Sequence, residues 1–483
     1  MSLIKSISGI RGTIGGEPGE NLTPIDIVKF TYAYCAKLRE RLPKPEGEHY
    51  KVVVGKDGRI SGGLVEDLVV GSLVACGVDV VKAGFASTPT TEMAVRFSKA
   101  DGGIILTASH NPRQWNALKL LNEKGEFLTA AEGQAVLDCA DSEDFHFAGV
   151  DSLGHVSEHD FTDEHIQAVL DLKDVDEQSI RDAGLTVVLD PVNSVGALIM
   201  PKLLERLGVN CITINQEVTG EFAHNPEPLP RNLTELSETV IQYHADLGIS
   251  VDPDVDRLAF ICEDGTPFVE ENTLVAVADY LFERAAKVAE TQGISLEEAT
   301  APFAPVSVSN LSSSRSLRDV TERWGGRYFA SAVGEVNVTT LIHEKNALIG
   351  GEGNGGVIFP AIHAGRDAMV GVGLFLSYVA AKKMKVSDIK ASLPQYSIVK
   401  NRIDLSDSAL IDKILSAVKE RYSSEKVNTI DGVKVDFEES RSWVHLRRSN
   451  TEPIIRIYSE APTEDAAQAL ADEVIEIAGK VIG

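Results

Sequence analysis

The chain has 483 residues, of which 43% are hydrophobic and 24% are charged. This is an ordinary globular composition, and the length suits roughly three to four domains. The formal net charge of -26 repels nucleic acid and anionic lipid, so we expect neither a nucleic-acid nor a membrane partner. The five cysteines include no C-x-x-C pair, which argues against a structural zinc site and favours buried thiols in a reducing compartment.

From the N-terminus onward, one local pattern is repeated along the chain. Residues 1–16 lack the continuous apolar core of a signal peptide. An apolar strand, a polar turn, an amphipathic helix and a second strand then follow one another at 51–83, 186–214 and 305–330. Strands that alternate with helices indicate α/β layers, and the repetition predicts three related domains in series.

A long apolar run follows at 368–381. It is too short to span a bilayer and is interrupted by Gly and Ser. Asp367, directly before it, is a good helix N-cap. We therefore expect a buried helix at this position and a cytoplasmic protein.

The C-terminal part of the chain departs from the repeated pattern. Strands are expected at 396–405, 433–435, 443–446 and 454–459, and helices at 408–422 and 463–478. Clustered strands flanked by helices predict a small α+β domain with an antiparallel sheet. The expected fold class is therefore α/β, with three related α/β domains and a smaller C-terminal α+β domain. The expected domains are 1–155, 156–262, 263–392 and 393–483.

The first motif that carries chemistry is Thr-Ala-Ser-His-Asn-Pro at 107–112, which follows the apolar run 103–106. A turn at the end of a buried strand presents the hydroxyl of Ser109 beside the imidazole of His110 and exposed backbone N–H groups. Such residues are common turn formers. Taken alone, the motif is better explained as a capped turn.

The second motif is Asp-Pro-Asp-Val-Asp-Arg at 252–257, after the apolar strand 247–251. Three carboxylates at alternate positions can converge on one hard cation, and oxygen ligands suit Mg²⁺. A calcium-binding EF-hand is excluded because Arg257 replaces its required Gly and strands, not helices, flank the loop. Ligands gather at strand ends in α/β sheets, which favours a cation site over an acidic turn. Arg257 could orient a phosphoryl oxygen.

The third motif contains five glycines around one carboxylate and one amide, at 350–356. It lacks the Gly-Lys-Ser/Thr of a P-loop. The side chains of Glu352 and Asn354 suit sugar hydroxyls, and a flexible turn is an equal alternative.

The fourth motif, Arg-Arg-Ser-Asn-Thr-Glu-Pro at 447–453, is followed by Arg456. It concentrates cations and hydroxyls in an acidic chain, which indicates a phosphate site. A solvated charged hairpin is the alternative.

In this order and spacing, the four motifs resemble the α-D-phosphohexomutase superfamily. With Ser-Gly-Ile-Arg-Gly at 8–12, the resemblance covers essentially the whole chain. It implies four domains around a central cleft, sugar phosphates as partners, one Mg²⁺ per chain and a monomer or homodimer. It also implies that a phosphoserine exchanges its phosphate with a hexose phosphate, through a hexose bisphosphate that serves as intermediate and activator.

The resemblance assigns roles residue by residue. Ser109 matches the phosphorylated nucleophile, whose phosphoryl oxygen joins Asp252, Asp254 and Asp256 around the metal. Lys119 matches a proposed proton-transfer group, His110 lies next to the nucleophile, and Arg11 matches a cleft arginine. Glu352 and Asn354 match the sugar loop, and Arg447, Ser449, Asn450, Thr451 and Arg456 match the loop that binds the phosphate not being transferred.

Two departures from the usual motifs bear on the sugar. The Asn-Gly-x-Lys that normally follows the serine motif is here Asn116-Ala117-Leu118-Lys119. The sugar loop lacks the Ser and His of the commonest phosphomannomutase and phosphoglucomutase versions and looks more like archaeal-type phosphoglucosamine mutases. We expect glucosamine phosphate as the substrate, with phosphomannomutase/phosphoglucomutase activity as the alternative.

Two other classes use part of the same chemistry. A sugar-phosphate phosphatase could employ the same serine and metal but admit water, and it would not need both the sugar and the phosphate loops. A non-catalytic sugar-phosphate sensor need not keep a nucleophile. The complete set of motifs therefore favours a mutase.

Overall fold

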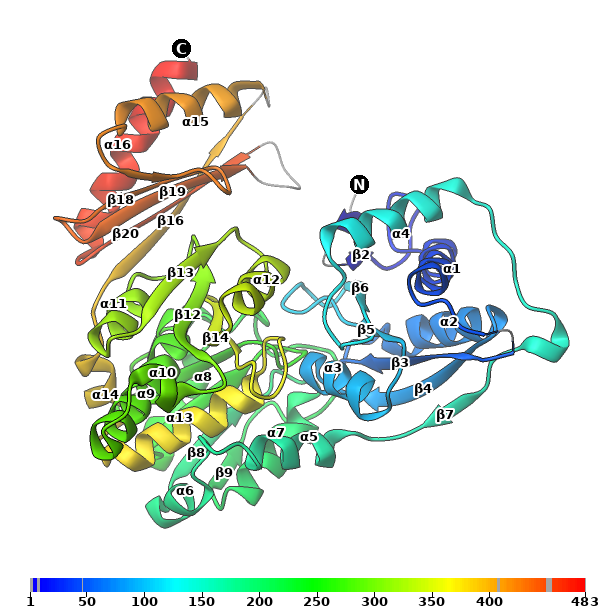
Figure 1. Ribbon diagram of the computed structural model, residues 1–483, viewed down its shortest axis with the longest axis horizontal. Helices are drawn as coiled ribbons and strands as arrows, with labels where there is room; N and C mark the ends of the chain where they lie inside the picture. Colours follow the sequence, from blue (N-terminus) through cyan, green and yellow to red (C-terminus); the bar gives the residue numbers. More distant parts are fainter. Residues whose placement is uncertain (1–2, 7–8, 46, 406–408, 449–453, 483) are drawn as a thin grey trace. The chain divides into compact units, whose positions relative to one another are not determined.

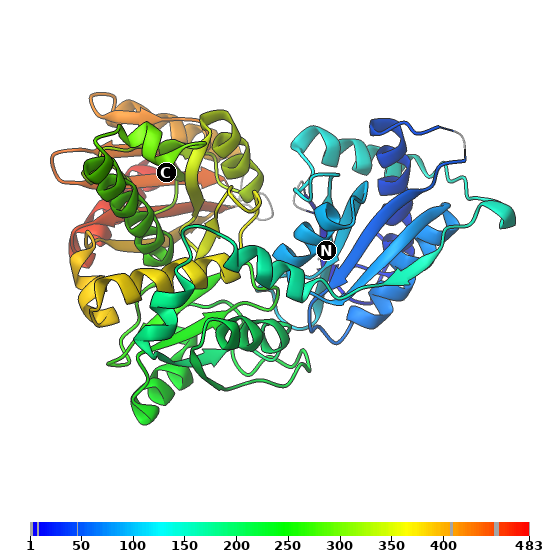
Figure 2. The ribbon, with the colours of Figure 1, turned by 60° about the horizontal axis from the view of Figure 1, so that its bottom comes forward.

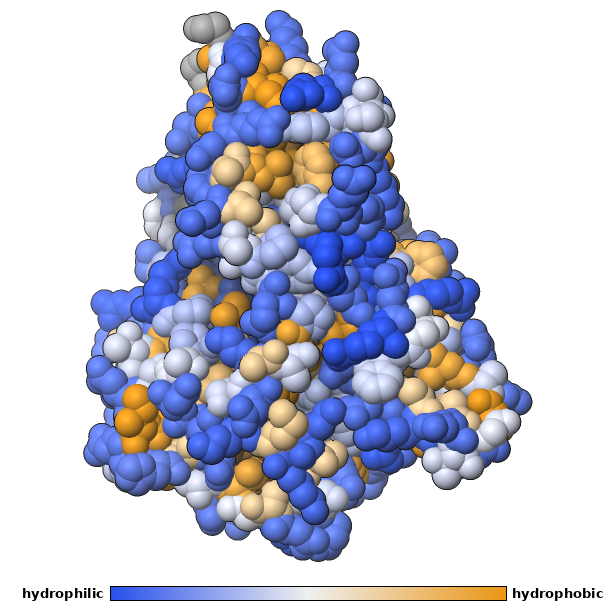
Figure 3. Space-filling view, turned by 90° about the vertical axis from the view of Figure 1, so that its left-hand side faces the viewer, coloured by the Kyte–Doolittle hydropathy of each residue, from blue (hydrophilic) through white to orange (hydrophobic). Residues whose placement is uncertain are grey.

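The computed structural model describes residues 3–6, 9–45, 47–405, 409–448 and 454–482. The chain forms two compact units, the first comprising Met1–Thr273 and Gly355–Ser387, the second Leu274–Asn354 and Asp388–Gly483. In the part of the chain described, no helix is both long and apolar enough to cross a membrane. Hydrophilic side chains dominate the face shown in Figure 3, where apolar residues form separate patches.

The first unit begins with a seven-stranded sheet in the order β1-β2-β6-β5-β3-β4-β7 (Figure 1). Its strands are β1 (Ile4–Ser6), β2 (Gly9–Thr13), β3 (Tyr50–Lys56), β4 (Val78–Phe85), β5 (Gly102–Leu106), β6 (Trp115–Leu121) and β7 (Val156–Glu158). The sheet is parallel from β5 through β3 and β4 to β7. It is antiparallel from β5 through β6 and β2 to β1.

Helices pack on both faces of this sheet (Figure 2). They are α1 (Pro24–Arg41), α2 (Gly62–Ala75), α3 (Thr88–Phe97) and α4 (Ala130–Ser142). In β3, Val52 and Val54 belong to the core under α1 and α2, whereas Val53 packs with α3 residues on the opposite face. Successive strand side chains alternate between faces, so a strand covered on both sides is apolar throughout.

The first unit contains a second, four-stranded sheet in the order β11-β10-β8-β9. Its strands are β8 (Thr186–Asp190), β9 (Asn210–Thr213), β10 (Leu247–Val251) and β11 (Leu258–Cys262). Strand β8 is parallel to β9 and β10, and β10 pairs antiparallel with β11. The second motif is the loop 252–257 between β10 and β11, and every residue of this loop is buried. It therefore lies at the carboxyl end of a central strand.

Further elements complete the first unit. They are the short helices η1 (Val150–Ser152) and η2 (Pro230–Asn232), α5 (Thr162–Leu170), α6 (Glu177–Ala183), α7 (Gly196–Arg206), α8 (Thr234–Tyr243), β15 (Gly356–Ile358) and α13 (Ala368–Lys382). The expected buried helix is confirmed as α13, whose N-cap Asp367 accepts hydrogen bonds from the backbone N–H groups of Met369 and Val370. Its Phe375 stacks on Phe260 of β11, with 3.9 Å between ring centroids.

The second unit starts with a parallel arrangement in which β12 lies between β13 and β14. The elements of this part are α9 (Glu270–Gln292), α10 (Leu296–Thr300), β12 (Ala304–Asn310), α11 (Ser316–Arg323), β13 (Arg327–Ser331), α12 (Glu335–Lys345) and β14 (Ala347–Glu352). Helix α14 (Val386–Ser392) contains the point at which the chain enters the second unit for the last time.

The C-terminal part has the expected α+β form. Its elements are β16 (Ser397–Asp404), α15 (Ala409–Arg421), β17 (Lys426–Asn428), β18 (Val433–Phe437), β19 (Ser442–Arg448), β20 (Ile454–Ala461) and α16 (Glu464–Ile482). The five strands form an antiparallel sheet in the order β16-β20-β19-β18-β17. Helices α15 and α16 cover one face (Figure 1), with Val418 and Val474 in the shared core.

Candidate active site

Ser109 is the third residue after the end of β5, in a turn that buried polar groups hold in place. Its backbone has φ 48°, in the left-handed region, and its backbone N–H donates to Thr107 Oγ1 at 2.9 Å. The Thr107 hydroxyl donates to Asp57 Oδ2 at 2.6 Å. Asp57 in turn pairs with Arg59, whose guanidinium donates to the carbonyl oxygens of Ser109 and Asn111. The turn is therefore tied to the end of β3.

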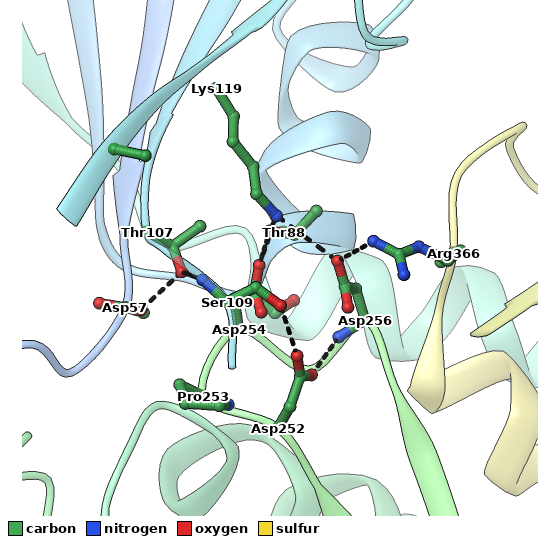
Figure 4. A network of polar contacts seen from close by, with 12 residues as sticks. Asp57, Thr88, Thr107, Ser109, Lys119, Asp252, Pro253, Asp254, Asp256 and Arg366 are labelled. Atoms are coloured by element: carbon green, nitrogen blue, oxygen red, sulfur yellow. Dashed lines mark hydrogen bonds and ion pairs between the residues drawn. The ribbon is translucent and has the colours of Figure 1, made fainter. Parts of the chain in front are cut away.

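The Ser109 hydroxyl faces the acidic loop between β10 and β11 (Figure 4). Its Oγ donates to Asp252 Oδ2 at 2.8 Å. Asp252 Oδ1 accepts from the backbone N–H groups of Asp256, at 3.1 Å, and Arg257, at 3.0 Å. Both oxygens of Asp252 are thus engaged, one by the loop itself and one by the nucleophile that the sequence predicts.

The three aspartates of the loop are completely buried and can bring one oxygen each within 4.8 Å of the others. Asp254 Oδ1 and Asp256 Oδ1 are buried and accept no hydrogen bond. A buried carboxylate oxygen without a partner is costly. A hard cation with oxygen ligands would satisfy both atoms, so these residues fit a bound Mg²⁺.

Two cations engage the remaining oxygens of Asp254 and Asp256. Lys119 Nζ lies 2.7 Å from Asp254 Oδ2 and 3.5 Å from Asp256 Oδ2. Arg366 Nη2 donates to Asp256 Oδ2 at 2.8 Å. Thr88 adds a neutral donor, with its hydroxyl 2.7 Å from Asp254 Oδ2. Each of these two aspartates therefore has one oxygen held by protein donors and one that accepts no hydrogen bond, and Arg257 Nε lies 3.9 Å from the second oxygen of Asp256.

The neighbouring charges in this cluster shift the pKa values of Asp252, Asp254 and Lys119. Burial raises the pKa of Asp252 well above its ordinary value, and Asp256 and Asp254 raise it further. Burial also acts to raise the pKa of Asp254, but the Lys119 ammonium outweighs it and the net pKa is lowered. Burial acts to lower the pKa of Lys119, yet the two carboxylates raise it above its ordinary value. Lys119 is therefore a cation at neutral pH.

His110 lies beside Ser109, and the charges of Arg257 and Arg11 act on its ring. His110 Nδ1 lies 3.4 Å from Ser109 Oγ. Burial and then the charges of Arg257 and Arg11 hold the pKa of His110 well below its ordinary value, so the imidazole is neutral at pH 7. Arg257 Nη1 pairs with Glu227 at 3.0 Å, and its Nε lies 3.9 Å from Asp252.

The predicted sugar loop lies in the second unit, at the end of β14. Glu352 Oε1 accepts from Asn310 Nδ2 at 2.9 Å, and Asn354 Nδ2 donates to Glu352 Oε2 at 3.4 Å. The backbone N–H of Gly353 donates to Ser313 Oγ at 3.0 Å. These hydrogen bonds join the glycine-rich loop to Asn310 at the end of β12 and to Ser313 in the turn that follows. A flexible turn without a function would not require them.

The predicted phosphate loop also belongs to the second unit. Arg447 and Arg456 are cross-strand partners in β19 and β20, and Arg447 Nε lies 3.4 Å from Asp431 Oδ2. Ser449, Asn450 and Thr451 lie outside the described residues. The described part therefore places two arginines at the strand ends from which the loop leaves.

Comparison with known proteins identifies the family. Four consecutive segments match phosphoglucomutase/phosphomannomutase domains: the alpha/beta/alpha domains I, II and III at residues 3–147, 163–265 and 271–396, and the C-terminal domain at 399–477. The chain belongs to the phosphoglucomutase/phosphomannomutase family. This confirms the resemblance to the α-D-phosphohexomutase superfamily and the predicted fold class.

Relatives within the phosphoglucomutase/phosphomannomutase family match the whole chain. It is 35% identical over 478 residues to a phosphoglucomutase/phosphomannomutase of Thermococcus kodakarensis, with 98% of each chain covered. It is 30% identical over 489 residues to a phosphoglucosamine/phosphogalactosamine mutase of Sulfurisphaera tokodaii, with 99% of each covered. A solved phosphoglucomutase/phosphomannomutase family protein of Burkholderia thailandensis has a TM-score of 0.80 at 23% identity, covering 99% of this chain and 98% of that one. This last likeness shows the shared fold.

Sequence reasoning missed several residues of this phosphoglucomutase/phosphomannomutase family member. Thr88 and Arg366 contact Asp254 and Asp256 of the acidic loop, and Arg59 supports the serine turn. None of them stands in a motif that suggests such a contact.

Proposed function

We propose that the chain is a phosphohexomutase, which interconverts hexose 6-phosphates and 1-phosphates. The observation that carries this proposal is the 2.8 Å contact between Ser109 Oγ and Asp252 Oδ2, in a loop whose other two aspartates present buried oxygens without hydrogen bonds. A hydroxyl nucleophile beside carboxylates that could bind Mg²⁺ suits phosphoryl transfer. Membership of the family and the names of its relatives support the same reaction.

In the proposed reaction, Ser109 carries a phosphoryl group. A sugar hydroxyl attacks the phosphorus and gives up its proton, the bond from phosphorus to Ser109 Oγ breaks, Ser109 Oγ takes up a proton, and a hexose bisphosphate forms. Ser109 Oγ then attacks the other phosphate of the bisphosphate and regains a phosphoryl group, leaving the isomeric monophosphate. One Mg²⁺ per chain, held by Asp252, Asp254 and Asp256 with a phosphoryl oxygen, would neutralise charge on the transferred group.

Four further residues serve the transfer in this proposal. Neutral His110, 3.4 Å from Ser109 Oγ, can take the serine proton when Ser109 becomes the nucleophile. Lys119, which matches the proton-transfer group of the family, is a cation paired with Asp254. It would donate a proton to the leaving oxygen of the phosphoryl transfer. Arg257 and Arg11 supply positive charge for the phosphoryl oxygens, since both lower the pKa of His110 beside the nucleophile.

The sugar would be bound by residues of the second unit. Glu352 and Asn354 are hydrogen-bonded to one another and would contact ring hydroxyls. Arg447 and Arg456, with Ser449, Asn450 and Thr451, would bind the phosphate that is not transferred. We keep the predicted domain borders at 155, 262 and 392 as a proposal; the matched segments are separated at 148–162, 266–270 and 397–398, within a few residues of these borders.

We further propose glucosamine phosphate as the preferred substrate. The Gly-Glu-Gly-Asn-Gly-Gly form of the loop around Glu352 supports this choice. The relatives divide between phosphoglucosamine mutase and phosphoglucomutase/phosphomannomutase names, which keeps glucose and mannose phosphates as the alternative substrates.

An assay of hexose phosphate isomerisation, with Mg²⁺ and a trace of hexose bisphosphate, tests the reaction. A mutase forms the isomeric sugar phosphate and releases no inorganic phosphate. Release of inorganic phosphate without isomerisation would show a phosphatase. Binding of sugar phosphate without either reaction would show a sensor.

A further inference from the structure

Arg366 contacts one oxygen of Asp256, which Lys119 Nζ approaches to 3.5 Å. Its Nη2 donates to Asp256 Oδ2 at 2.8 Å, and the Asp256 Oδ1 accepts no hydrogen bond. Arg366 is only 7% exposed and Asp256 is fully buried. Figure 4 shows the guanidinium approaching Asp256 from the side opposite Lys119. The hold on Oδ2 therefore leaves Oδ1 as the oxygen that can face a cation.

The backbone on both sides of Arg366 is fixed by buried charges. Asp367 caps α13 through its Oδ1, while its Oδ2 lies 3.1 Å from His363 Nε2. His363 Nδ1 lies 3.1 Å from Glu92 Oε2 of α3. Gly365 packs so closely on Glu92 that an added Cβ would lie 1.9 Å from the Glu92 Oε2. The segment that carries Arg366 is thus clamped between α3 and the start of α13.

Each ring nitrogen of His363 lies 3.1 Å from a carboxylate oxygen, and two buried carboxylates beside one ring favour its positively charged form. The side chains of His363, Glu92 and Asp367 are 3%, 1% and 0% exposed. A buried cation between two buried carboxylates has no alternative solvent partner, and the pairs therefore fix its position. His165 joins from α5, with its Nε2 2.8 Å from Asp367 Oδ2.

A metal ion at His165, His363 and Asp367 is the competing explanation of this cluster. Nε2 of both rings contacts Asp367 Oδ2, at 2.8 Å for His165 and 3.1 Å for His363, and His165 Nδ1 lies 3.0 Å from Thr90 Oγ1. A ring nitrogen that donates its proton to a carboxylate has no lone pair to offer a metal. The hydrogen-bonded ion cluster is therefore the better explanation.

We propose that His363, clamped between Glu92 and Asp367, is a positioning residue that acts through Arg366 on the metal ligand Asp256. The proposal rests on the proposed mutase function. Groups that orient metal ligands typically affect metal affinity or activity by about 10–100-fold when removed. If His363 acts through Arg366, the losses in activity caused by substituting His363 and Arg366 should not be additive in the double variant.

The test is a double-mutant cycle with Arg366→Lys, His363→Gln and the combined variant. Lysine keeps the charge but loses the reach of the guanidinium. Each single substitution should lower kcat about tenfold and leave KM within about twofold, and the double variant should resemble Arg366→Lys alone. Losses that multiply in the double variant would overturn the proposal, as would an unchanged kcat for either single variant.

A matched control and a substitute variant keep this test decisive. Arg323→Lys alters an arginine that pairs with Asp279 in the second unit and should leave kcat unchanged. If His363→Gln does not fold, Glu92→Gln takes its place in the cycle, because it removes the other side of the same clamp.

A binding measurement separates this proposal from the proposed function. Mn²⁺ titration of the non-phosphorylated protein, followed by electron paramagnetic resonance, needs no turnover. Arg366→Lys should raise the Mn²⁺ dissociation constant about tenfold, because Asp256 Oδ2 is no longer held. An unchanged constant overturns the positioning role. A wild-type protein that binds Mn²⁺ in this way but isomerises no sugar phosphate refutes the mutase function alone.

Discussion

Ser109 depends on partners drawn from other parts of the chain. Its turn is supported by Thr107 and Asp57, and its hydroxyl meets Asp252 from a different sheet. A serine hydroxyl is a weak nucleophile unless neighbouring groups activate it. The supported turn fixes the hydroxyl in one direction, toward the carboxylates, which is the requirement for accepting and returning a phosphoryl group.

The first prediction concerns this hydroxyl. Ser109→Ala should fold normally and lose at least about three decades of turnover, because no other group replaces the covalent step. Ser98→Ala serves as the control, since the Ser98 hydroxyl only donates to Ala94 O at the end of α3. Intact-mass analysis should find phosphate on Ser109. Undiminished isomerisation by Ser109→Ala would show that the phosphoserine mechanism is wrong.

The second prediction concerns the metal. Asp254→Asn and Asp256→Asn should weaken Mg²⁺ binding and activity together, because each removes charge from a buried oxygen that has no hydrogen bond. EDTA should abolish turnover, and Mg²⁺ should restore it better than Ca²⁺, which prefers more ligands. Asp264→Asn, in the turn after β11, should change neither property. Full activity in a metal-free preparation would contradict the proposed role.

Among individual residues, those that belong to a contiguous sequence motif could be predicted as candidate site residues. Residues of the site that stand outside any motif could not. Asp252, Asp254 and Asp256 stand at alternate positions after an apolar strand, which is a local pattern. Thr88 and Arg366 meet them only because the fold brings distant segments together. A single threonine or arginine has no local pattern that distinguishes such a role from an ordinary surface position.

At the scale of elements, the strands that open the repeated strand–helix pattern were predictable, and the first two strands of the chain were not. Strands β3, β8 and β12 are short apolar runs followed by helices, and they were expected. Strands β1 and β2, at the edge of the first sheet, are short and mixed in polarity, with burial patterns that include exposed and half-buried residues. Periodicity does not identify such strands, because their pairing is set by tertiary contacts.

The third prediction belongs to the strand pair β19–β20. Arg456→Ala should raise KM for sugar phosphate about tenfold or more, because a charge-assisted hydrogen bond contributes about 1.5–3 kcal/mol. Arg441→Ala is a matched control at the opposite end of β19, where Arg441 pairs with Asp319. An unchanged KM for Arg456→Ala, with normal folding, would place the loop outside the site.

The fourth prediction concerns the junction of α3, α5 and α13. Burial acts to lower the pKa of His363, but Asp367 and Glu92 raise it from 6.5 to about 9. Because the folded pKa exceeds the unfolded one, this stabilisation is complete below pH 6.5 and is lost as pH rises through about 9. The shift corresponds to about 3 kcal/mol.

Thermal melting at pH 6.5 and pH 9.5 measures this effect. The fall in Tm between the two pH values should be larger for the wild type than for His363→Gln, which has no titrating ring. Equal falls in the two proteins would contradict a charged His363 in the folded state.

At the scale of the whole chain, the order of the motifs was more informative than any one of them. Each motif alone has an ordinary explanation as a turn or a charged loop, whereas four in one order identify a family that the comparisons confirm. The division into two units, with Gly355–Ser387 returning to the first, was not predictable. It depends on which surfaces pack, and local patterns do not report that.

The last prediction concerns the sugar and the charge of the whole chain. Glucosamine phosphate carries a positive amino group at neutral pH, and a net charge of -26 should favour it modestly by long-range attraction. Glu352 and Asn354 suit ring hydroxyls that gluco- and manno-sugars share, so they do not select the substituent at C2, and we expect side activity on glucose or mannose phosphate. The measurement is kcat/KM for the three sugar phosphates under one condition, repeated at high salt, where the preference for glucosamine should shrink. A value for glucose or mannose about tenfold above that for glucosamine, roughly 1.4 kcal/mol, would reverse the choice of substrate and leave the mutase mechanism intact.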